Sequence, residues 1–152
     1  MTMNGATKLK RSVKSVLASQ KLAVLATHRK GRPHTSLVAF VATAGLENLL
    51  FATARATRKF ANVMADPRVA LLVDTRTNRD ADFHSAVAVT ATGHAAEVRG
   101  PMRARLLKVY IAGHPSLEEF VKSPACALLR LRVNRYYVVS RFQNVMELRM
   151  AQ

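Results

Sequence analysis

Three strand-length segments in the first third of the chain follow one another with only short turns between them. They cover residues 22–28, 34–43 and 49–53. Gly31 and Pro33 mark the first turn, because glycine permits unusual backbone angles and proline fixes its own φ. Strands joined this tightly pair in antiparallel fashion, since a parallel connection needs a crossover of about a dozen residues. This part of the chain is therefore predicted to form an antiparallel meander.

Further strands are predicted at residues 68–74, 85–97, 126–133, 136–142 and 145–150. The segment 68–74 is apolar without alternation, which predicts a strand buried on both faces. Gly93 predicts a bulge or kink in the strand that contains it. Because most strands are neighbours in sequence, the pattern favours a mainly β (α+β) fold. We expect an antiparallel barrel with peripheral helices rather than a doubly wound parallel sheet.

Helical periodicity predicts helices at residues 8–19 and 58–65 and between Pro101 and Gly113. Ser116 and Glu119 have the spacing of a capping box, which predicts the start of a further short helix. The length of 152 residues fits one domain, with residues 1–7 expected to be a flexible tail.

The composition indicates a cytoplasmic protein without a membrane partner. No stretch of about 20 apolar residues is present, and the N-terminus lacks the apolar segment of a signal peptide. The single cysteine, Cys126, excludes an intrachain disulfide and lies in an apolar segment. We therefore expect Cys126 to pack in the core rather than act as a nucleophile.

The net charge of +15, from 24 Lys and Arg against 9 Asp and Glu, points to an anionic partner. A nucleic acid is one such partner. The basic residues are dispersed, however, and the chain has no Trp and only 6% aromatic residues, so no base-stacking platform is evident. An anionic cofactor fits the charge better than a nucleic acid does.

One cationic segment lies where a helix is predicted to begin. Thr57 is a suitable N-cap, and Arg58 and Lys59 follow it in the first turn. Cations are unfavourable there, because a helix N-terminus already carries partial positive charge. A phosphate would offset this cost, binding free N–H groups and both side chains. The alternative is a pair of solvated cations on a surface turn.

Common catalytic motifs are absent. The sequence has no GxGxxG, no P-loop and no GxSxG elbow, and its five histidines show no metal-ligand spacing. Asp80, Asp82 and His84 are the nearest candidates for a metal site, and a polar loop with local Asx turns is the favoured interpretation of them. An enzyme of this kind would borrow its reactive group from a cofactor.

The order of several segments carries a family resemblance. Gly31-Arg-Pro-His-Thr-Ser-Leu-Val-Ala-Phe40 is followed by residues 50–62, with their central Thr57-Arg-Lys59, then by 66–74 and the tail 136–148. In this order the segments resemble the pyridoxamine 5′-phosphate oxidase-like family, which has the FMN-binding split-barrel fold. The resemblance covers the chain from about residue 10 and implies a Greek-key-like split β-barrel.

The resemblance also implies a homodimer with FMN at the subunit interface. Arg58 and Lys59 would bind the FMN phosphate with help from Thr53, and Ser36, Leu37 and Val38 would line the ribityl chain and ring. Weaker candidates for flavin or substrate contacts are Arg76, Asn78, His84, Arg141 and Phe142. Their alternative roles are loop-ordering hydrogen bonds for Arg76, Asn78 and His84, a solvated cation for Arg141 and a core residue for Phe142.

Two departures from the oxidase proper change the expected activity. Val41 stands where that enzyme has a lysine near the flavin, and its tryptophan-containing C-terminal segment is missing. We therefore expect an FMN-dependent oxidoreductase acting with a small-molecule substrate or electron donor, rather than vitamin B6 oxidation. Split-barrel relatives also bind haem or a deazaflavin, so a haem-binding or haem-degrading barrel is the main alternative. A basic nucleic-acid-binding barrel is a further one.

Overall fold

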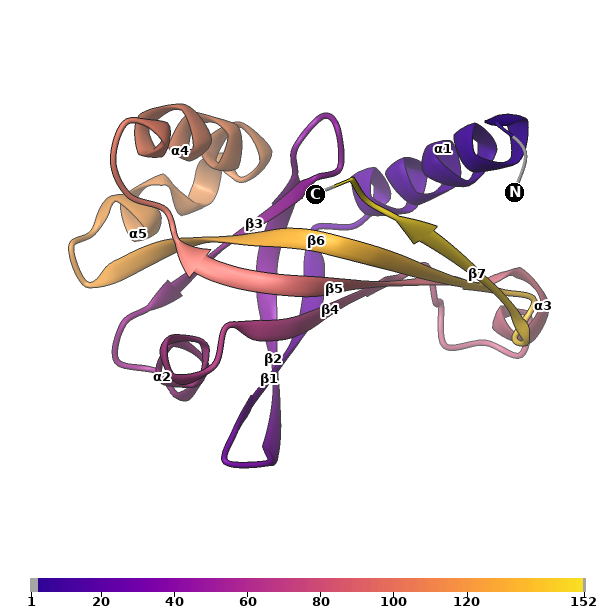
Figure 1. Cartoon of the computed structure of the whole chain (residues 1–152), viewed down its shortest axis with the longest axis horizontal. Coiled ribbons are helices and arrows are strands. Elements are labelled where there is room, and N and C mark those ends of the chain that lie inside the picture. The colour runs from indigo at the N-terminus through magenta and orange to yellow at the C-terminus, as the bar shows by residue number, and fades with distance from the viewer. Residues whose placement is uncertain (1–2, 152) are drawn as a thin grey trace.

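The computed structural model describes residues 3–151 and contains a closed antiparallel β-barrel (Figure 1). The strands pair in the order β3-β2-β1-β4-β5-β6-β7, and β3 also pairs with β6, which closes the first six into a barrel. The strands are β1 Leu22–Arg29, β2 Arg32–Ala42, β3 Asn48–Ala54, β4 Arg68–Asp74, β5 Val87–Glu97, β6 Cys126–Ser140 and β7 Asn144–Arg149. The predicted split-barrel fold is confirmed.

Helices surround the barrel (Figure 1). They are α1 Met3–Ser19, α2 Arg58–Ala65, α3 Asp82–Ser85, α4 Met102–Gly113 and α5 Glu118–Lys122, with a 3₁₀ turn, η1, at Pro115–Leu117. Helix α1 begins five residues before the predicted start, because residues 3–7 continue its helical turns. The expected tail is thus helical from Met3 on, and residues 1 and 2 lie outside the described part.

Alternate side chains of the strands point inward and fill the barrel interior. Leu25, Phe51, Leu71 and Leu129 are fully buried members of one core, against which α1 packs. A second core lies under α4 and α5, with the buried side chains Leu50, Leu106, Tyr110, Val121 and Leu128. Strand β3 and the start of β6 contribute to both cores, so these are the strands buried on both faces.

That finding corrects the prediction for β4. Its bounds are as predicted, but its residues alternate: Val69, Leu71 and Val73 are buried, whereas Ala70 and Leu72 are only partly covered. An apolar run does not show what covers its outer face. Helices α4 and α5 cover the outer faces of β3 and β6. No helix of the described chain fully covers the outer face of β4.

Strand β6 is one continuous element, so the predicted break at residues 134 and 135 is wrong. The pairing with β5 shifts there: Thr92 opposes Arg135 and Gly93 opposes Val133, which leaves Asn134 without a partner in β5. The carbonyl of Asn134 instead accepts a hydrogen bond of 2.9 Å from the Met150 amide. The irregularity predicted at Gly93 is present, but its extra residue, Asn134, lies in β6 rather than in the strand that contains Gly93.

The Ser116–Glu119 capping box does not form, because residues 115–117 make the 3₁₀ turn and α5 starts at Glu118 without a side-chain cap. Cys126 is buried and packs in the second core, as expected. None of the described helices combines the length and hydrophobicity that a membrane span needs, and the cytoplasmic location stays a prediction.

Candidate functional site

The turn between β3 and α2 is held by two threonines. The Thr57 hydroxyl accepts from the Phe60 amide at 3.3 Å and donates to the Ala54 carbonyl at 2.8 Å. The Thr53 hydroxyl lies 3.0 Å from that of Thr57, and Thr53 is almost fully buried. Thr57 is therefore the predicted N-cap. Thr53 supports the cap from below and does not line the neighbouring pocket.

Helix α2 is fixed against the barrel by one buried polar contact and an apolar face. The Asn62 side-chain amide donates to the Thr27 hydroxyl of β1 at 3.0 Å, and both residues are buried. Val63 belongs to the barrel core, and Phe60 packs against it. This packing directs the start of α2 toward the β1–β2 hairpin.

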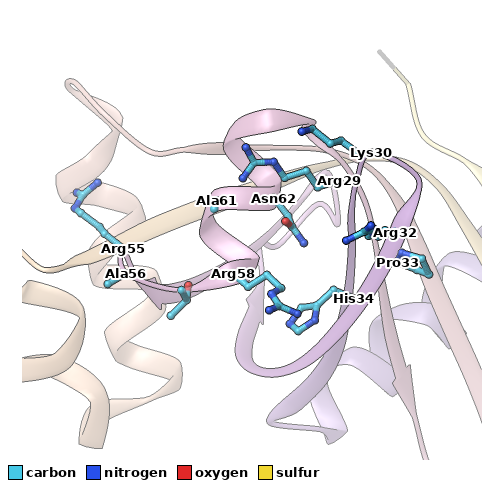
Figure 2. Close-up of a pocket in the computed structure, with 11 residues that line it drawn as sticks. Arg29, Lys30, Arg32, Pro33, His34, Arg55, Ala56, Arg58, Ala61 and Asn62 are labelled. Atoms are coloured by element: carbon cyan, nitrogen blue, oxygen red, sulfur yellow. The ribbon is translucent and has the colours of Figure 1, made fainter.

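A pocket of about 850 Å³ lies between the start of α2 and that hairpin (Figure 2). Its lining includes five Lys and Arg side chains and no Asp or Glu. The lining residues are Arg29, Lys30, Arg32, Pro33, His34, Arg55, Ala56, Thr57, Arg58, Ala61 and Asn62. Such a wall is chemically suited to an anion, since cations without local counter-charges gain most from one.

The cations at this turn differ in their availability. Arg55 donates to both carboxylate oxygens of Glu97, at 2.6 and 3.0 Å, and these bonds lower the pKa of Glu97. Arg58 and Lys59 make no ion pair or hydrogen bond through their side chains with any described residue. Arg58 lines the pocket, whereas Lys59 is half-buried beside it. The two predicted phosphate ligands, Arg58 and Lys59, therefore have no protein partner, whereas Arg55 is already bonded to Glu97.

The three predicted residues of β2 do not all lie on one face of the sheet, because successive side chains of a strand point to opposite faces. Val38 is buried in the barrel core, and Ser36 and His34 follow on the same face toward the pocket. The Ser36 hydroxyl is buried without a hydrogen-bond partner, the one such side-chain atom among residues 3–151. Leu37 points to the outer face and is 67% exposed. Val38 can thus contribute to a bound group only through its backbone.

Leu37 lies with two other predicted residues on the outer face of the barrel. A shallow depression of about 270 Å³ is lined by Leu37, Arg76 and Asn78, together with Leu22 and Leu72. Arg76 pairs with Asp74 at 3.0 Å, and the Asn78 amide donates to Asp82 at 2.7 Å from a backbone with φ of 62°. Arg76 thus makes a loop contact through its side chain, whereas Asn78 does so through its backbone N–H.

The last three predicted residues belong to α3 and the β6–β7 turn, which lie at the opposite end of the barrel from α2 (Figure 1). His84 is exposed on α3, and Arg141 is exposed in the β6–β7 turn. Phe142 is 64% exposed and contacts Phe83 edge-to-face, with ring centroids 5.4 Å apart. The alternative of a core position for Phe142 is therefore wrong. One chain alone does not bring these residues to the pocket at α2.

Among the acidic residues of the loop, Asp82 makes hydrogen bonds within the loop. Asp82 accepts from the Thr77 amide at 2.8 Å and from the Thr77 hydroxyl at 2.8 Å, and the hydroxyl contact is the main cause of its lowered pKa. In the described part of the chain, no three His, Cys, Asp or Glu side chains gather as a metal site would require. The loop interpretation of Asp80, Asp82 and His84 fits these contacts.

Sequence reasoning missed the hairpin side of the pocket. Arg29, Lys30, Arg32 and His34 line it, whereas the sequence predicted only a turn at Gly31 and Pro33 there. The available signal was the concentration of cations around a Lys-Gly turn. Their position beside α2 depends on the contact between Asn62 and Thr27, which links residues 35 positions apart.

Solved structures share this fold. A haem-binding protein from Mycobacterium smegmatis matches 90% of this chain with a TM-score of 0.80 and 18% identity, and the chain spans only 55% of that protein. General Stress Protein 26 from Bacillus anthracis matches 93% of this chain over 98% of its own length, with a TM-score of 0.72 and 21% identity. An FAD-binding protein from Mesorhizobium loti matches 84% over 90% of its length, with a TM-score of 0.68 and 16% identity.

At these identities the likeness to solved structures shows the fold alone. No curated protein matches the chain in sequence. The sequence pattern of the family described as pyridoxamine 5′-phosphate oxidase, in contrast, matches residues 9–140, which include β1 to β6, the α2 turn and the pocket. The chain therefore belongs to the pyridoxamine 5′-phosphate oxidase family.

Proposed function

We propose that the protein is an FMN-dependent oxidoreductase that passes electrons to a small-molecule acceptor. The observation that carries this proposal is the carboxylate-free pocket at the start of α2, with Arg58 unpaired in its wall. Membership of the family supports a flavin as the anion. Bound FMN would supply the redox chemistry, and the protein would supply binding, orientation and the electrostatic environment.

The residues at the pocket fit a phosphate monoester. The first amides of a helix have no intrahelical partner, and here Thr57 satisfies only that of Phe60 by its side chain. The amides of Arg58 and Lys59 and the positive end of the α2 dipole are left to a ligand. Arg58 would bind the phosphate in bidentate fashion, with Lys59 as a second charge and Thr53 holding the cap in place.

The Ser36 hydroxyl fits the next part of such a ligand. Buried polar groups normally have partners, because an unsatisfied one loses its hydration without compensation. Ser36 lies two residues from His34, on the strand face that leads from the pocket into the barrel. A hydroxyl or ring atom of the flavin would satisfy it. No protein nucleophile is needed in this arrangement.

We propose further that the active form is a homodimer. Helix α3, with His84, and the β6–β7 turn, with Arg141 and Phe142, lie at the far end of the barrel from α2 (Figure 1). These residues can therefore approach a flavin at α2 only from a second copy. Leu22 and Leu37 are 57% and 67% exposed on the outer face, where a second copy would cover them. The depression with Arg76 and Asn78 belongs to the same face.

Vitamin B6 oxidation is not part of this proposal. Val41, which stands where the oxidase has its lysine, packs against the second core, and Gly113 of α4 is close to it. No cation therefore approaches the flavin from that position.

An absorbance spectrum of the purified protein, followed by titration of the flavin-free form with FMN and riboflavin, tests the function. We expect the visible absorbance bands of an oxidised flavin, from bound FMN acting as the cofactor. We expect FMN to bind much more tightly than riboflavin, which lacks the phosphate. A protein that neither carries nor takes up FMN would refute the proposal.

Haem is the second candidate, because one histidine lines the pocket. His34 does so, whereas His114 bonds to the Phe40 carbonyl at 2.8 Å and His28 lies 3.1 Å from Asp66. A Soret band that appears on adding haem and is lost in His34→Ala would favour this function over the flavin.

A further inference from the structure

The tip of the β1–β2 hairpin concentrates positive charge that no group in the described chain neutralises. Arg29, Lys30 and Arg32 are three cations among four consecutive residues. None of their side chains makes an ion pair or hydrogen bond with another residue between 3 and 151. Arg29 and Arg32 are also direct cross-strand partners. Like charges in that position destabilise a hairpin, so the tip is assembled at a cost to the free protein.

The backbone of the turn adds to this cost. Lys30 and Gly31 both have positive φ, 52° and 74°, as a two-residue type I′ turn requires. Asparagine, aspartate and glycine relieve the strain of such positions, and lysine does not. The chain therefore places a cation where an uncharged residue would give a more stable turn.

The three side chains face the same pocket as Arg58 (Figure 2). A phosphate monoester carries about two negative charges near neutral pH, which Arg58 and Lys59 already balance. Arg29, Lys30 and Arg32 thus exceed what one phosphate needs. The pocket, at about 850 Å³, has room for a ligand larger than one phosphate and its attachment.

We propose that the hairpin tip is a second phosphate-binding subsite, for a phosphate group other than the one held at α2. The group is either the second phosphate of a flavin dinucleotide or a phosphate of a separate molecule that reacts with the bound flavin. The identity of the first phosphate rests on the proposed function; the subsite itself rests on the hairpin. Arg29 and Arg32 would clamp the group, which would remove the repulsion between them.

The test compares two charge-neutralised proteins. The tip variant is Arg29→Gln, Lys30→Asn, Arg32→Gln. The matched control removes three unpaired cations from α4, as Arg103→Gln, Arg105→Gln, Lys108→Gln. Flavin-free protein is titrated with FMN and with FAD, and FMN-loaded protein with inorganic pyrophosphate and with NADPH, all at one ionic strength by calorimetry. Lys30→Asn alone is added because it removes a charge and relieves the turn.

We expect the tip variant to bind FMN within about twofold of the wild type, because Arg58 is intact. Loss of at least tenfold in FAD affinity alone assigns the subsite to a dinucleotide. The same loss for pyrophosphate or NADPH on FMN-loaded protein assigns it to a separate molecule. Lys30→Asn should weaken the same ligand while raising the thermal midpoint, which separates charge loss from unfolding.

Equal affinities of the wild type, tip variant and α4 control for every ligand would overturn the subsite. So would equal losses in the tip variant and the control, since the effect would then be net charge alone. Should no flavin bind, pyrophosphate is titrated into the flavin-free proteins instead. A tenfold loss confined to the tip variant would then support the subsite while the flavin proposal falls.

Discussion

The guanidinium of Arg55 donates two hydrogen bonds, of 2.6 and 3.0 Å, to the carboxylate of Glu97. It donates a third, of 3.0 Å, to the Pro124 carbonyl. These bonds join the turn after β3 to the end of β5 and to the loop before β6. Arg55 is thereby a structural cation at the edge of the pocket, whereas Arg58, three residues later, is unpaired. The two arginines should respond to mutation in different ways.

Glu97→Gln should make the free energy of unfolding fall less steeply as the pH becomes acidic. The Arg55 hydrogen bonds hold the pKa of Glu97 below its ordinary value of 4.5. A lowered folded pKa gives stability that is fully present above 4.5 and is lost as pH falls through the lowered value. Urea unfolding at pH 7, 5, 4 and 3 measures this, with Asp80→Asn as control. A Glu97→Gln protein with the wild-type pH slope would contradict the prediction.

Arg58→Ala should weaken FMN binding by about 10- to 100-fold, the range expected for a charge-assisted bond to phosphate. Riboflavin affinity should stay unchanged, because riboflavin lacks the phosphate. Arg105→Ala removes an exposed cation of α4 and serves as the matched control. Fluorescence quenching during flavin titration gives the affinities of the wild type and of both variants for the two ligands. A loss of riboflavin affinity equal to that of FMN would show that Arg58 does not act on the phosphate.

Ser36→Ala should have opposite effects on the free and the loaded protein. Removing a buried hydroxyl without a partner should stabilise the flavin-free form by about 1 kcal/mol. The same change should lower FMN affinity by about 5-fold, since the ligand loses one hydrogen bond. Urea unfolding and FMN titration provide the two numbers. Destabilisation of the free protein would instead reveal a partner for Ser36.

Gly93→Ala should destabilise the barrel by about 3 kcal/mol, the upper part of the range for overpacking. A Cβ at Gly93 would run into the backbone carbonyl of Arg132, which the sheet holds in place. Gly45→Ala is the control, because its Cβ would meet only the movable end of the Glu47 side chain. Thermal unfolding distinguishes the two. Equal melting temperatures would mean that the bulge can shift.

Local signals predicted much of this fold. The bounds of α2 follow from the Thr57 cap and from Asp66-Pro67, which are read within a few residues. The hairpin strands and the pairing irregularity at Gly93 follow in the same way, although the extra residue at that point belongs to β6. The continuity of β6 and the outer face of β4 depend on pairing and covering partners far away in sequence, which no short segment specifies.

In the candidate site, too, features set by local sequence could be predicted, and features set by distant residues could not. Arg58 could be recognised because its unfavourable place in the first turn is a local property. The engagement of Arg55 could not, since Glu97 lies 42 positions away. The separation of His84, Arg141 and Phe142 from α2 follows from antiparallel pairing. Strand β4 runs from α2 to the loop that contains α3, and the start of β5 pairs with the end of β6.

That separation leads to the last prediction, on assembly. Leu37→Asp should convert the proposed dimer to monomers, because a carboxylate would be desolvated in an apolar interface. Phe120→Asp, on α5, changes a 42% exposed aromatic residue and should leave the assembly intact. Light scattering behind size-exclusion chromatography measures both masses. Because α2 and the β6–β7 turn can meet only between copies, the Leu37→Asp monomer should also lose FMN affinity. A folded monomer that binds FMN as the wild type does would show that one chain holds a complete site.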